Sequence, residues 1–391
     1  MDRVVIVGGG LAGAEAARAL RARGFAGELA LVGAEPEPPY DRPPLSKEVL
    51  RGDSDGVPVE LDWADLRVRL RLGTEATGLR PGLVETSAGK LPYDGLVVAT
   101  GSVPVRLPGA AGGRTLRTIR DARELRAALT PGARVVVIGA GWIGAEVATA
   151  ALRAGAAVTA LEVLDEPLAA ALPTEIAART RSWWAGVDLR TRTRVEAVEA
   201  VAVHLTGGGV VPADVVVVGV GVRPATAWLA GSDVALGSDG GVLTDARTRT
   251  SVPGVVAVGD CAAWESPRYG TRLRVEHWDT ALRAPAIAAA TLLGAEEVYD
   301  PVPYFWSEQF GRTVQTIGLP GLATRWVWRE EGASWAACGL LGDRLVAVVA
   351  ADRHHDAAAA RRLLARGPAP GPPADPAVLA DPSLPLRSAV A

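Results

Sequence analysis

Lysine is nearly absent from this sequence, although positive charge is not. The 391 residues include 41 Lys plus Arg, yet only Lys47 and Lys90 are lysines. A drift of composition toward arginine would have replaced any lysine that only needed to be positive. Lys47, at the end of "PYDRPPLSK", is therefore a candidate for a site that needs a compact, tunable ammonium instead of a planar guanidinium. From composition alone, the presence of Lys47 at this position by chance is an equally good explanation.

Cysteine and histidine are also scarce, which excludes several kinds of site. Cys261 and Cys338 are the only cysteines and lie far apart, so neither a thiolate metal site nor a disulfide framework is expected. Cys261 is expected to be a small buried hydrophobic residue. The four histidines are scattered and lack a His-x-x-x-His spacing, so we assign no metal.

Long apolar runs and an excess of charge of one sign are missing as well. No run approaches the roughly 18 to 20 residues that span a bilayer, and the N-terminus lacks the basic segment and apolar core of a signal peptide. The net charge of -3 and the pI near 5.9 argue against generic nucleic-acid binding. We expect a cytoplasmic protein with neither a membrane nor a nucleic acid as partner.

The sequence does contain two copies of a strand, glycine turn and helix pattern. "RVVIVGGGLAGAEAARALRARG" recurs as "ARVVVIGAGWIGAEVATAALRAG" at 133–155. The apolar runs "GLVVATGS", "DVVVVGVGVRP" and "GVVAVGD" suit strands that are covered on both faces. The pattern predicts an α/β fold with two Rossmann-like dinucleotide-binding domains of three-layer architecture.

The composition and the hydrophobic pattern change near residue 301. Four tryptophans gather there, "RWVW" and "RLVAVVAA" alternate as antiparallel strands do, and "HDAAAARRLLARG" reads as a helix. We expect a C-terminal α+β interface domain at 301–391, whose Pro-rich end forms an ordered-to-loose tail on the surface. The dinucleotide-binding domains would comprise 1–108 with 227–300, and 109–226.

The first glycine turn has the features of a dinucleotide fingerprint. Gly8 permits the tight turn, Gly10 lets a pyrophosphate approach the backbone, and Gly13 allows close packing of the helix. Glu35 ends the next strand, where an acidic residue binds ribose hydroxyls. A glycine-rich turn in an ordinary strand–helix–strand unit is the less favoured alternative, because all these contexts agree.

The second turn contains Gly139, Gly141 and Gly144, and Glu162 ends its following strand. An acidic residue there accepts from both ribose hydroxyls and repels a 2′-phosphate, and no arginine follows closely in "EVLDEP". This favours NADH over NADPH; the alternative is a solvated Glu162 with selectivity determined elsewhere. Two dinucleotide folds in one chain predict a flavin together with a nicotinamide.

Several motifs carry a resemblance to a known family. "YDRPPLSK", the paired fingerprints, "LVVATGS", "TSVPGVVAVGDCA", "VEHWDTAL" and "VPYFWSEQFG" together resemble the FAD-dependent NADH:ferredoxin reductases of oxygenase systems, which are putidaredoxin/rubredoxin reductase-like members of the glutathione-reductase superfamily. The likeness runs from about residue 3 to 388. It implies FAD and NAD as cofactors, with electrons passing from NADH through FAD to a small [2Fe-2S] ferredoxin. The domain of 1–108 and 227–300 would bind FAD, and that of 109–226 would bind NAD.

The resemblance also implies roles for individual residues. Those assigned to FAD are Gly8, Gly10, Gly13, Glu35, Arg42, Lys47, Asp260, Trp278 and Trp306. Those assigned to NAD are Gly139, Gly141, Trp142, Gly144 and Glu162. Taken singly, Trp278 and Trp306 are more often core residues, and Asp260 also suits a helix N-cap.

Lys47 and Glu146 are the residues to which the resemblance gives a catalytic role. Lys47 would hold positive charge beside the flavin where hydride arrives, and Glu146, the acid of the GxGxxGxE fingerprint, would temper that charge and fix its position. Trp142 falls where the superfamily often has an aromatic lid over the nicotinamide pocket. Because no cysteine pair accompanies the flavin, we expect electrons to leave from the flavin itself.

The sequence also departs from the family pattern and leaves alternatives open. Glu308 and Thr280 replace the usual Asp and Asn, and Pro285 is expected to kink or shorten its helix. Arginines that could dock an acidic ferredoxin, or merely form a solvated basic face, are Arg268, Arg272, Arg274 and Arg312. The alternative functions are an NADH oxidase or other small-molecule-reducing flavoprotein, and a redox sensor resembling apoptosis-inducing factor. A monomer and a homodimer are both compatible.

Overall fold

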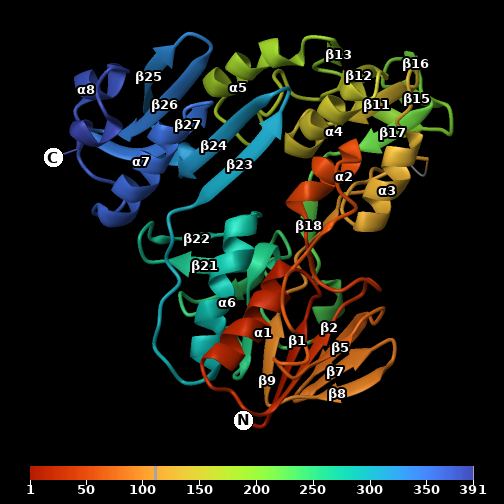
Figure 1. The fold of residues 1–391 in the computed structure, drawn as a ribbon, viewed down its shortest axis with the longest axis vertical. Helices are drawn as coiled ribbons and strands as arrows, with labels where there is room; N and C mark the ends of the chain where they lie inside the picture. Colours follow the sequence, from red (N-terminus) through yellow and green to blue (C-terminus); the bar gives the residue numbers. More distant parts are fainter. Residues whose placement is uncertain (110–111, 391) are drawn as a thin grey trace. The chain divides into compact units, whose positions relative to one another are not determined.

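The computed structural model of the chain describes residues 1–109 and 112–390. Two residues of the expected second domain and the last residue of the expected C-terminal domain lie outside this range. The chain divides into two compact units. Unit 1 comprises Met1–Asp41, Val57–Val103 and Val222–Pro301, and unit 2 comprises Arg42–Gly56, Pro104–Gly221 and Val302–Ala391 (Figure 1).

The centre of unit 1 is a five-stranded parallel sheet in the order β20-β9-β1-β2-β5. Its strands are β1 (Arg3–Val7), β2 (Glu28–Val32), β5 (Val68–Arg71), β9 (Gly95–Val98) and β20 (Val255–Ala257). Successive residues of a strand point to opposite faces, so Val4 and Ile6 pack with the helices α1 (Leu11–Ala22) and α6 (Trp278–Leu292). Val5 and Val7 belong to a second core on the other face. Because both faces are covered, β1 is apolar throughout.

Smaller elements complete unit 1. Leu79 and Val84 extend the second core from an antiparallel sheet of β6 (Ala76–Arg80), β7 (Leu83–Thr86) and β8 (Gly89–Pro92). The other short strands are β3 (Tyr40–Asp41) with β4 (Val57–Pro58), β10 (Ser102–Pro104) with β18 (Val222–Pro224), and β19 (Val242–Thr244), β21 (Ala262–Ser266) and β22 (Thr271–Leu273). The 3-10 turns are η3 (Ala227–Leu229) and η4 (Gly259–Cys261).

Helix α6 is not shortened at Pro285, which was one of the two effects expected from this proline. The helix begins after the N-cap His277, whose Nδ1 accepts a hydrogen bond from the Asp279 N–H at 3.2 Å, and it continues through Pro285 to Leu292. Proline removes one helical N–H donor and crowds the preceding turn. Both Pro285 and Ala284 are buried. Thr280, the other departure in this helix, is buried too.

Unit 2 repeats the first architecture with a four-stranded parallel sheet in the order β13-β12-β11-β17. The strands are β11 (Arg134–Ile138), β12 (Ala157–Leu161), β13 (Val187–Arg190) and β17 (Val215–Val218). The helices and 3-10 turns before and between them are η1 (Pro43–Ser46), α2 (Glu48–Arg51), α3 (Ile119–Ala128), α4 (Trp142–Arg153), α5 (Thr174–Thr180) and η2 (Arg181–Trp184). Val136 and Val216 share a core with the antiparallel sheet of β14 (Val195–Val198), β15 (Ala202–Leu205) and β16 (Val210–Pro212).

The C-terminal part of unit 2 is an antiparallel sheet in the order β23-β24-β27-β26-β25 (Figure 1). Its strands are β23 (Tyr304–Gln309), β24 (Arg312–Gly318), β25 (Arg325–Glu331), β26 (Ser334–Leu341) and β27 (Arg344–Ala351), and the turn η5 (Pro320–Leu322) follows β24. One face packs on α7 (His354–Arg366), and the other packs on Leu168, Leu172 and Ile176 in and before α5. The predicted fold class is confirmed: two parallel Rossmann-like sheets and a C-terminal α+β part.

The Pro-rich end, expected as an ordered-to-loose tail on the surface, is ordered and partly buried. It forms α8 (Pro376–Ala380) and η6 (Leu386–Ala389), and Leu379 and Leu386 join the core of the C-terminal sheet. Arg329, 1% exposed, holds this segment by donating to the carbonyl oxygens of Leu379 at 2.8 Å and Leu384 at 2.6 Å. A buried guanidinium with several fixed acceptors orders a chain that proline content alone would leave extended.

Each Rossmann-like sheet contains the same acidic contact at the start of its first strand. Asp94 accepts from the N–H groups of Asp2 at 2.8 Å and Arg3 at 2.9 Å, and Asp214 accepts from the Arg134 N–H at 2.8 Å. The bond from the Asp2 N–H, followed by those from Arg3, lowers the pKa of Asp94 to about 2. The Arg134 side chain and N–H lower the pKa of Asp214 to about 2.

We expect these two carboxylates to contribute to acid unfolding. A carboxyl group whose pKa is lower in the folded state stabilises the fold above its unfolded pKa, and this stabilisation disappears as the pH falls through the folded value. The Asp94→Asn/Asp214→Asn variant should therefore be less stable than the parent protein at pH 6, and the difference should shrink between about pH 4 and pH 2. Urea unfolding at several pH values measures this, with Glu28→Gln as the control. A difference that stays constant with pH would contradict the assignment.

Candidate functional site

The glycines of the turn in unit 1 differ in what surrounds them. Gly8 has φ +131° and leaves no room for a side chain, since a Cβ there would lie 2.0 Å from the Ala99 carbonyl oxygen. At Gly13 a Cβ would lie 2.0 Å from the Gly8 oxygen. At Gly10 a Cβ would meet no described atom within 4 Å. Gly8 and Gly13 are therefore required by the fold, whereas Gly10 borders open space.

The turn in unit 2 repeats this arrangement position by position. Gly139 has φ +97°, and a Cβ there would lie 2.5 Å from the Gly219 oxygen. At Gly144 it would lie 2.0 Å from the Gly139 oxygen, and at Gly141 it would meet nothing described within 4 Å. The open glycine is again the residue that immediately precedes a helix.

Open space at these positions suits a pyrophosphate. Gly10 and Gly141 are the N-caps of α1 and α4, and in the described structure neither helix start has a capping side chain or an acidic residue in its first turn. The first N–H groups of a helix lack intrahelical partners and attract anions. The residues present therefore fit a dinucleotide at each turn.

The two acidic residues at the strand ends are held by their own chain. The Tyr40 hydroxyl donates to Glu35 Oε2 at 2.5 Å. Glu162 is 8% exposed, and its two oxygens accept from the N–H groups of Ala140 at 2.7 Å and Leu164 at 2.9 Å. Glu162 is thus not solvated, and its part in the selectivity for NADH stays a prediction. Each carboxylate oxygen has two lone pairs, so Glu162 can fix the glycine turn and still accept from a ribose hydroxyl.

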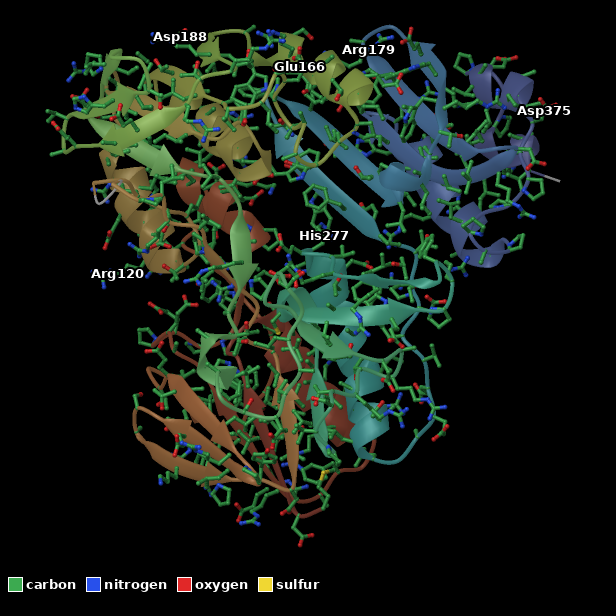
Figure 2. The ribbon with its side chains drawn as sticks, turned by 180° about the vertical axis from the view of Figure 1, so that it is seen from behind. Arg120, Glu166, Arg179, Asp188, His277 and Asp375 are labelled. Carbon is green, nitrogen blue, oxygen red and sulfur yellow. The ribbon has the colours of Figure 1, made fainter. Side chains whose placement is uncertain are left out.

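Two arginines that the sequence places far from Glu162 lie beside the loop that follows β12. Arg192 donates to Asp165 Oδ1 at 2.7 Å, and Arg181 donates to Glu166 Oε2 at 3.0 Å. Glu166 is labelled in this loop in Figure 2. Sequence reasoning missed both arginines, because they come from the segment that returns along β13. Each arginine is paired with an adjacent carboxylate, which weakens its electrostatic attraction for a 2′-phosphate.

In unit 1, two of the expected flavin residues are oriented by side chains that carried no assignment. Ser102 donates to Asp260 Oδ2 at 2.9 Å, and the Trp278 Nε1–H donates to Asp41 Oδ1 at 3.0 Å. Asp260 lies in the first turn of η4 and is not an N-cap, a position that Val258 occupies. Ser102 and Asp41 both belong to motifs that the sequence did single out, "LVVATGS" and "YDRPPLSK".

The three tryptophans with expected roles are partly exposed, unlike core residues. Trp278 begins α6 directly after His277, which Figure 2 labels. Trp306 stacks with Tyr304 in unit 2, with ring centroids 5.8 Å apart. Trp142 begins α4 and packs against Phe305 at a centroid distance of 4.6 Å. All three side chains are half-buried, which leaves ring surface for a planar ligand.

Lys47 and Glu146 meet in unit 2 as a buried ion pair. Lys47 Nζ lies 3.0 Å from Glu146 Oε1, and the side chains are 9% and 5% exposed. Lys47 follows η1 and Glu146 lies in the second turn of α4. The lysine segment Arg42–Gly56 therefore packs against α4, the helix that follows the second glycine turn. Arg42 is anchored in the same unit, where its Nη1 donates to the Arg117 carbonyl oxygen at 2.7 Å.

Both cysteines are buried and unpaired. Burial raises the pKa of the Cys261 thiol, and it raises that of Cys338 to about 12. Such thiols do not supply the thiolate that disulfide exchange requires. Within residues 1–109 and 112–390, no group of three or more His, Cys, Asp or Glu side chains is placed to hold a metal ion. None of the helices described there is long and apolar enough to cross a membrane.

The candidate docking arginines are engaged within the chain. Three of them have carboxylate partners, namely Arg272 with Glu265 at 2.6 Å, Arg274 with Asp239 at 2.6 Å and Arg312 with Asp352 at 2.9 Å. The backbone N–H of Arg268 donates to Asp300 Oδ2 at 2.9 Å. Such pairs reduce the field that a distant acidic partner would sense, and a docking role for these residues stays a prediction.

Comparison with known proteins agrees with this geometry. The pyridine nucleotide-disulphide oxidoreductase family matches residues 2–284, and the reductase C-terminal family matches 304–390. The chain belongs to the pyridine nucleotide-disulphide oxidoreductases. The anthranilate 1,2-dioxygenase system ferredoxin–NAD(+) reductase component of Burkholderia cepacia is 40% identical to it over 410 residues, covering 99% of each chain.

Solved structures of similar oxidoreductases cover the whole fold. The crystal structure of Fdr9 matches with a TM-score of 0.94 and 48% identity over 99% of both chains. The reductase in a covalent putidaredoxin reductase–putidaredoxin complex matches with a TM-score of 0.92 and 34% identity, covering 99% of this chain and 97% of that one. The resemblance found in the sequence is therefore confirmed. The chain is an oxidoreductase of a family that uses FAD and NAD(H), as predicted.

Substitution of two glycines in one turn separates binding from folding in this oxidoreductase. Gly141→Ala places a Cβ in open space but puts a poorer N-cap residue at the start of α4. Because a smaller unfolded-state entropy offsets that cost, stability should change by less than about 1 kcal/mol. The dissociation constant for NADH should rise by about tenfold or more, because the backbone can no longer approach a pyrophosphate. Gly144→Ala should destabilise the fold by roughly 1 to 3 kcal/mol. Thermal unfolding and NADH titration measure both effects. Equal NADH affinity in Gly141→Ala and the parent protein would contradict the assigned pyrophosphate position.

Proposed function

We propose that the chain is an FAD-dependent NADH:ferredoxin reductase of an oxygenase system. The observation that carries this proposal is the combination of two open glycine turns with two buried, unpaired cysteines. The two turns suit two dinucleotides. Neither buried thiol can carry electrons from a bound flavin to a disulfide substrate, so the electrons must leave from the flavin itself. The 40% identity to a ferredoxin–NAD(+) reductase component along nearly the whole chain supports the same conclusion.

FAD would bind mainly through the residues of unit 1. The α1 turn would hold its pyrophosphate beside Gly10, and Glu35, fixed by Tyr40, would accept from its adenosine ribose. Asp260, oriented by Ser102, would accept from the ribityl hydroxyls. Trp278, whose ring is fixed through its bond to Asp41, would contact the isoalloxazine. The family resemblance assigns Arg42, Lys47 and Trp306 to FAD as well.

NADH would bind at the second turn, beside Gly141. Glu162 would accept from the ribose hydroxyls of the adenosine half, and its negative charge disfavours the phosphate of NADPH at the same place. Trp142 would border the nicotinamide from the first residue of α4. This arrangement makes NADH the expected electron donor.

FAD, when bound, accepts hydride from NADH and releases electrons singly to an iron–sulfur protein. Lys47 would place a fixed positive charge beside the ring, where negative charge increases during reduction. Glu146 balances the charge of Lys47 before a ligand arrives, so that the ammonium can remain buried. As the electron acceptor we propose a small [2Fe-2S] ferredoxin, the partner class in the names of its relatives.

Anaerobic titration of the FAD-loaded protein tests this function. NADH should bleach the flavin bands at much lower concentration than NADPH does, and an added [2Fe-2S] ferredoxin should restore them faster than air. Fast return in air with no ferredoxin reduction would instead indicate an oxidase. Slow turnover accompanied by a change in oligomeric state would indicate a redox sensor. A protein without bound flavin, or without response to NADH, would contradict the two-dinucleotide account.

A further inference from the structure

The carboxylate of Glu146 has two donors besides Lys47. Ser307 Oγ donates to Glu146 Oε1 at 2.6 Å, and Ser46 Oγ donates to Glu146 Oε2. Ser307 is fully buried, and Ser46 is 5% exposed. The three donors come from the lysine segment and from strand β23, whereas Glu146 itself belongs to α4.

These hydroxyls supply hydrogen bonds that a buried ion pair needs. Removing a carboxylate and an ammonium from water costs more than their attraction returns, unless further hydrogen bonds satisfy them. A hydroxyl that donates to a carboxylate stabilises the ionised form over the protonated one. Ser46 and Ser307 supply this stabilisation at Glu146, and they act on both of its oxygens.

The position of Ser307 follows from the packing of β23 on α4. Trp142, Glu146 and Thr149 lie on one face of α4, at helical spacings of four and three residues. Phe305 packs on Trp142 at 4.6 Å, and the Phe310 N–H donates to Thr149 Oγ1 at 2.8 Å. Ser307 lies between these two contacts, so its hydroxyl is aligned with Glu146 by the strand itself.

Lys47 retains a donor for a bound group. Its Nζ lies 3.0 Å from Glu146 Oε1 and donates to the Pro43 carbonyl oxygen at 3.3 Å. An ammonium has three N–H donors, and these two contacts within the described chain use two of them. A protonated, fixed Lys47 therefore offers one N–H, and the direction of that N–H depends on where Glu146 is held.

We propose that Ser46 and Ser307 are positioning residues that keep Glu146 ionised and oriented, and thereby keep Lys47 charged with one N–H directed to the flavin. The effect on Glu146 follows from its contacts with Ser46 and Ser307. Only the direction of the Lys47 N–H toward the flavin rests on the proposed function. The C-terminal sheet thus contributes Ser307 to the environment of the catalytic lysine.

The scarcity of lysine makes a direct test possible. FAD-loaded protein labelled with [ε-¹³C]lysine should give two Cε signals, one from Lys47 and one from the exposed Lys90. The chemical shift of the Lys47 signal is followed as the pH is lowered, and an inflection in this curve reports proton uptake by the adjacent Glu146. In Ser46→Ala and in Ser307→Ala this inflection should move to higher pH by about one unit, because a hydrogen bond to a charged group and one unit of titration have similar free energies. The double variant should move further.

Matched controls separate this effect from general damage to the fold. Ser266→Ala removes a buried serine that donates to Asp300 Oδ1 at 2.5 Å outside this cluster, and it should leave the Lys47 signal unchanged. Ser307→Cys keeps a side-chain donor but a weaker one, and it replaces Ser307→Ala if that variant does not fold. The Lys90 signal serves as the internal reference.

An unchanged Lys47 inflection in folded serine variants would overturn the proposal. That result would leave the proposed function standing, because the resonance is read without an electron acceptor. Failure of ferredoxin reduction, with the inflections shifted as expected, would instead count against the proposed function and not against the positioning role of Ser46 and Ser307. As a second readout, the rate of flavin reduction by NADH is measured against pH. The pH at which this rate falls on the acid side should shift by the same amount as the inflection of the Lys47 signal. An unchanged pH profile would overturn the claim that Glu146 acts on the flavin through Lys47.

Discussion

The burial of one lysine with one glutamate is the constraint on which the rest of unit 2 depends. Two charges at 9% and 5% exposure are unfavourable unless each finds several partners, and those partners are supplied by distant parts of the chain. The lysine segment Arg42–Gly56 packs in unit 2, although its neighbours in sequence belong to unit 1. The C-terminal sheet supplies Ser307, and its core is continuous with the residues around α5.

The fold was largely predictable because its signals are local and occur twice. In both copies the first and last fingerprint glycines meet backbone within 2.5 Å, and the middle one faces open space. Steric requirements of this kind appear in a sequence as a fixed spacing. The acidic residue that holds the first strand, Asp94 in one sheet and Asp214 in the other, is part of the same repetition.

The contacts that hold the site were less predictable, because they join residues whose separation in sequence is arbitrary. Lys47 and Glu146 could be paired only through the family resemblance, and Ser46 and Ser307 had no signal beyond their place in quoted motifs. Composition was misleading at the C-terminus, where Arg329 orders a proline-rich segment by bonds to its carbonyl oxygens. Arg192 was missed near Glu162 for the same reason, since strand order and not chain order brings it there.

The most direct test of the central claim compares the two lysines of the chain. Stopped-flow reduction of the FAD-loaded protein by saturating NADH would be measured for Lys47→Arg and Lys90→Arg. If Lys47 provides a compact charge in a closed cluster, Lys47→Arg should slow flavin reduction by about 100-fold, the usual effect of losing a positioned electrostatic group, and Lys90→Arg should leave the rate unchanged. Equal rates in both variants and the parent protein would contradict the account, because any positive charge would then suffice.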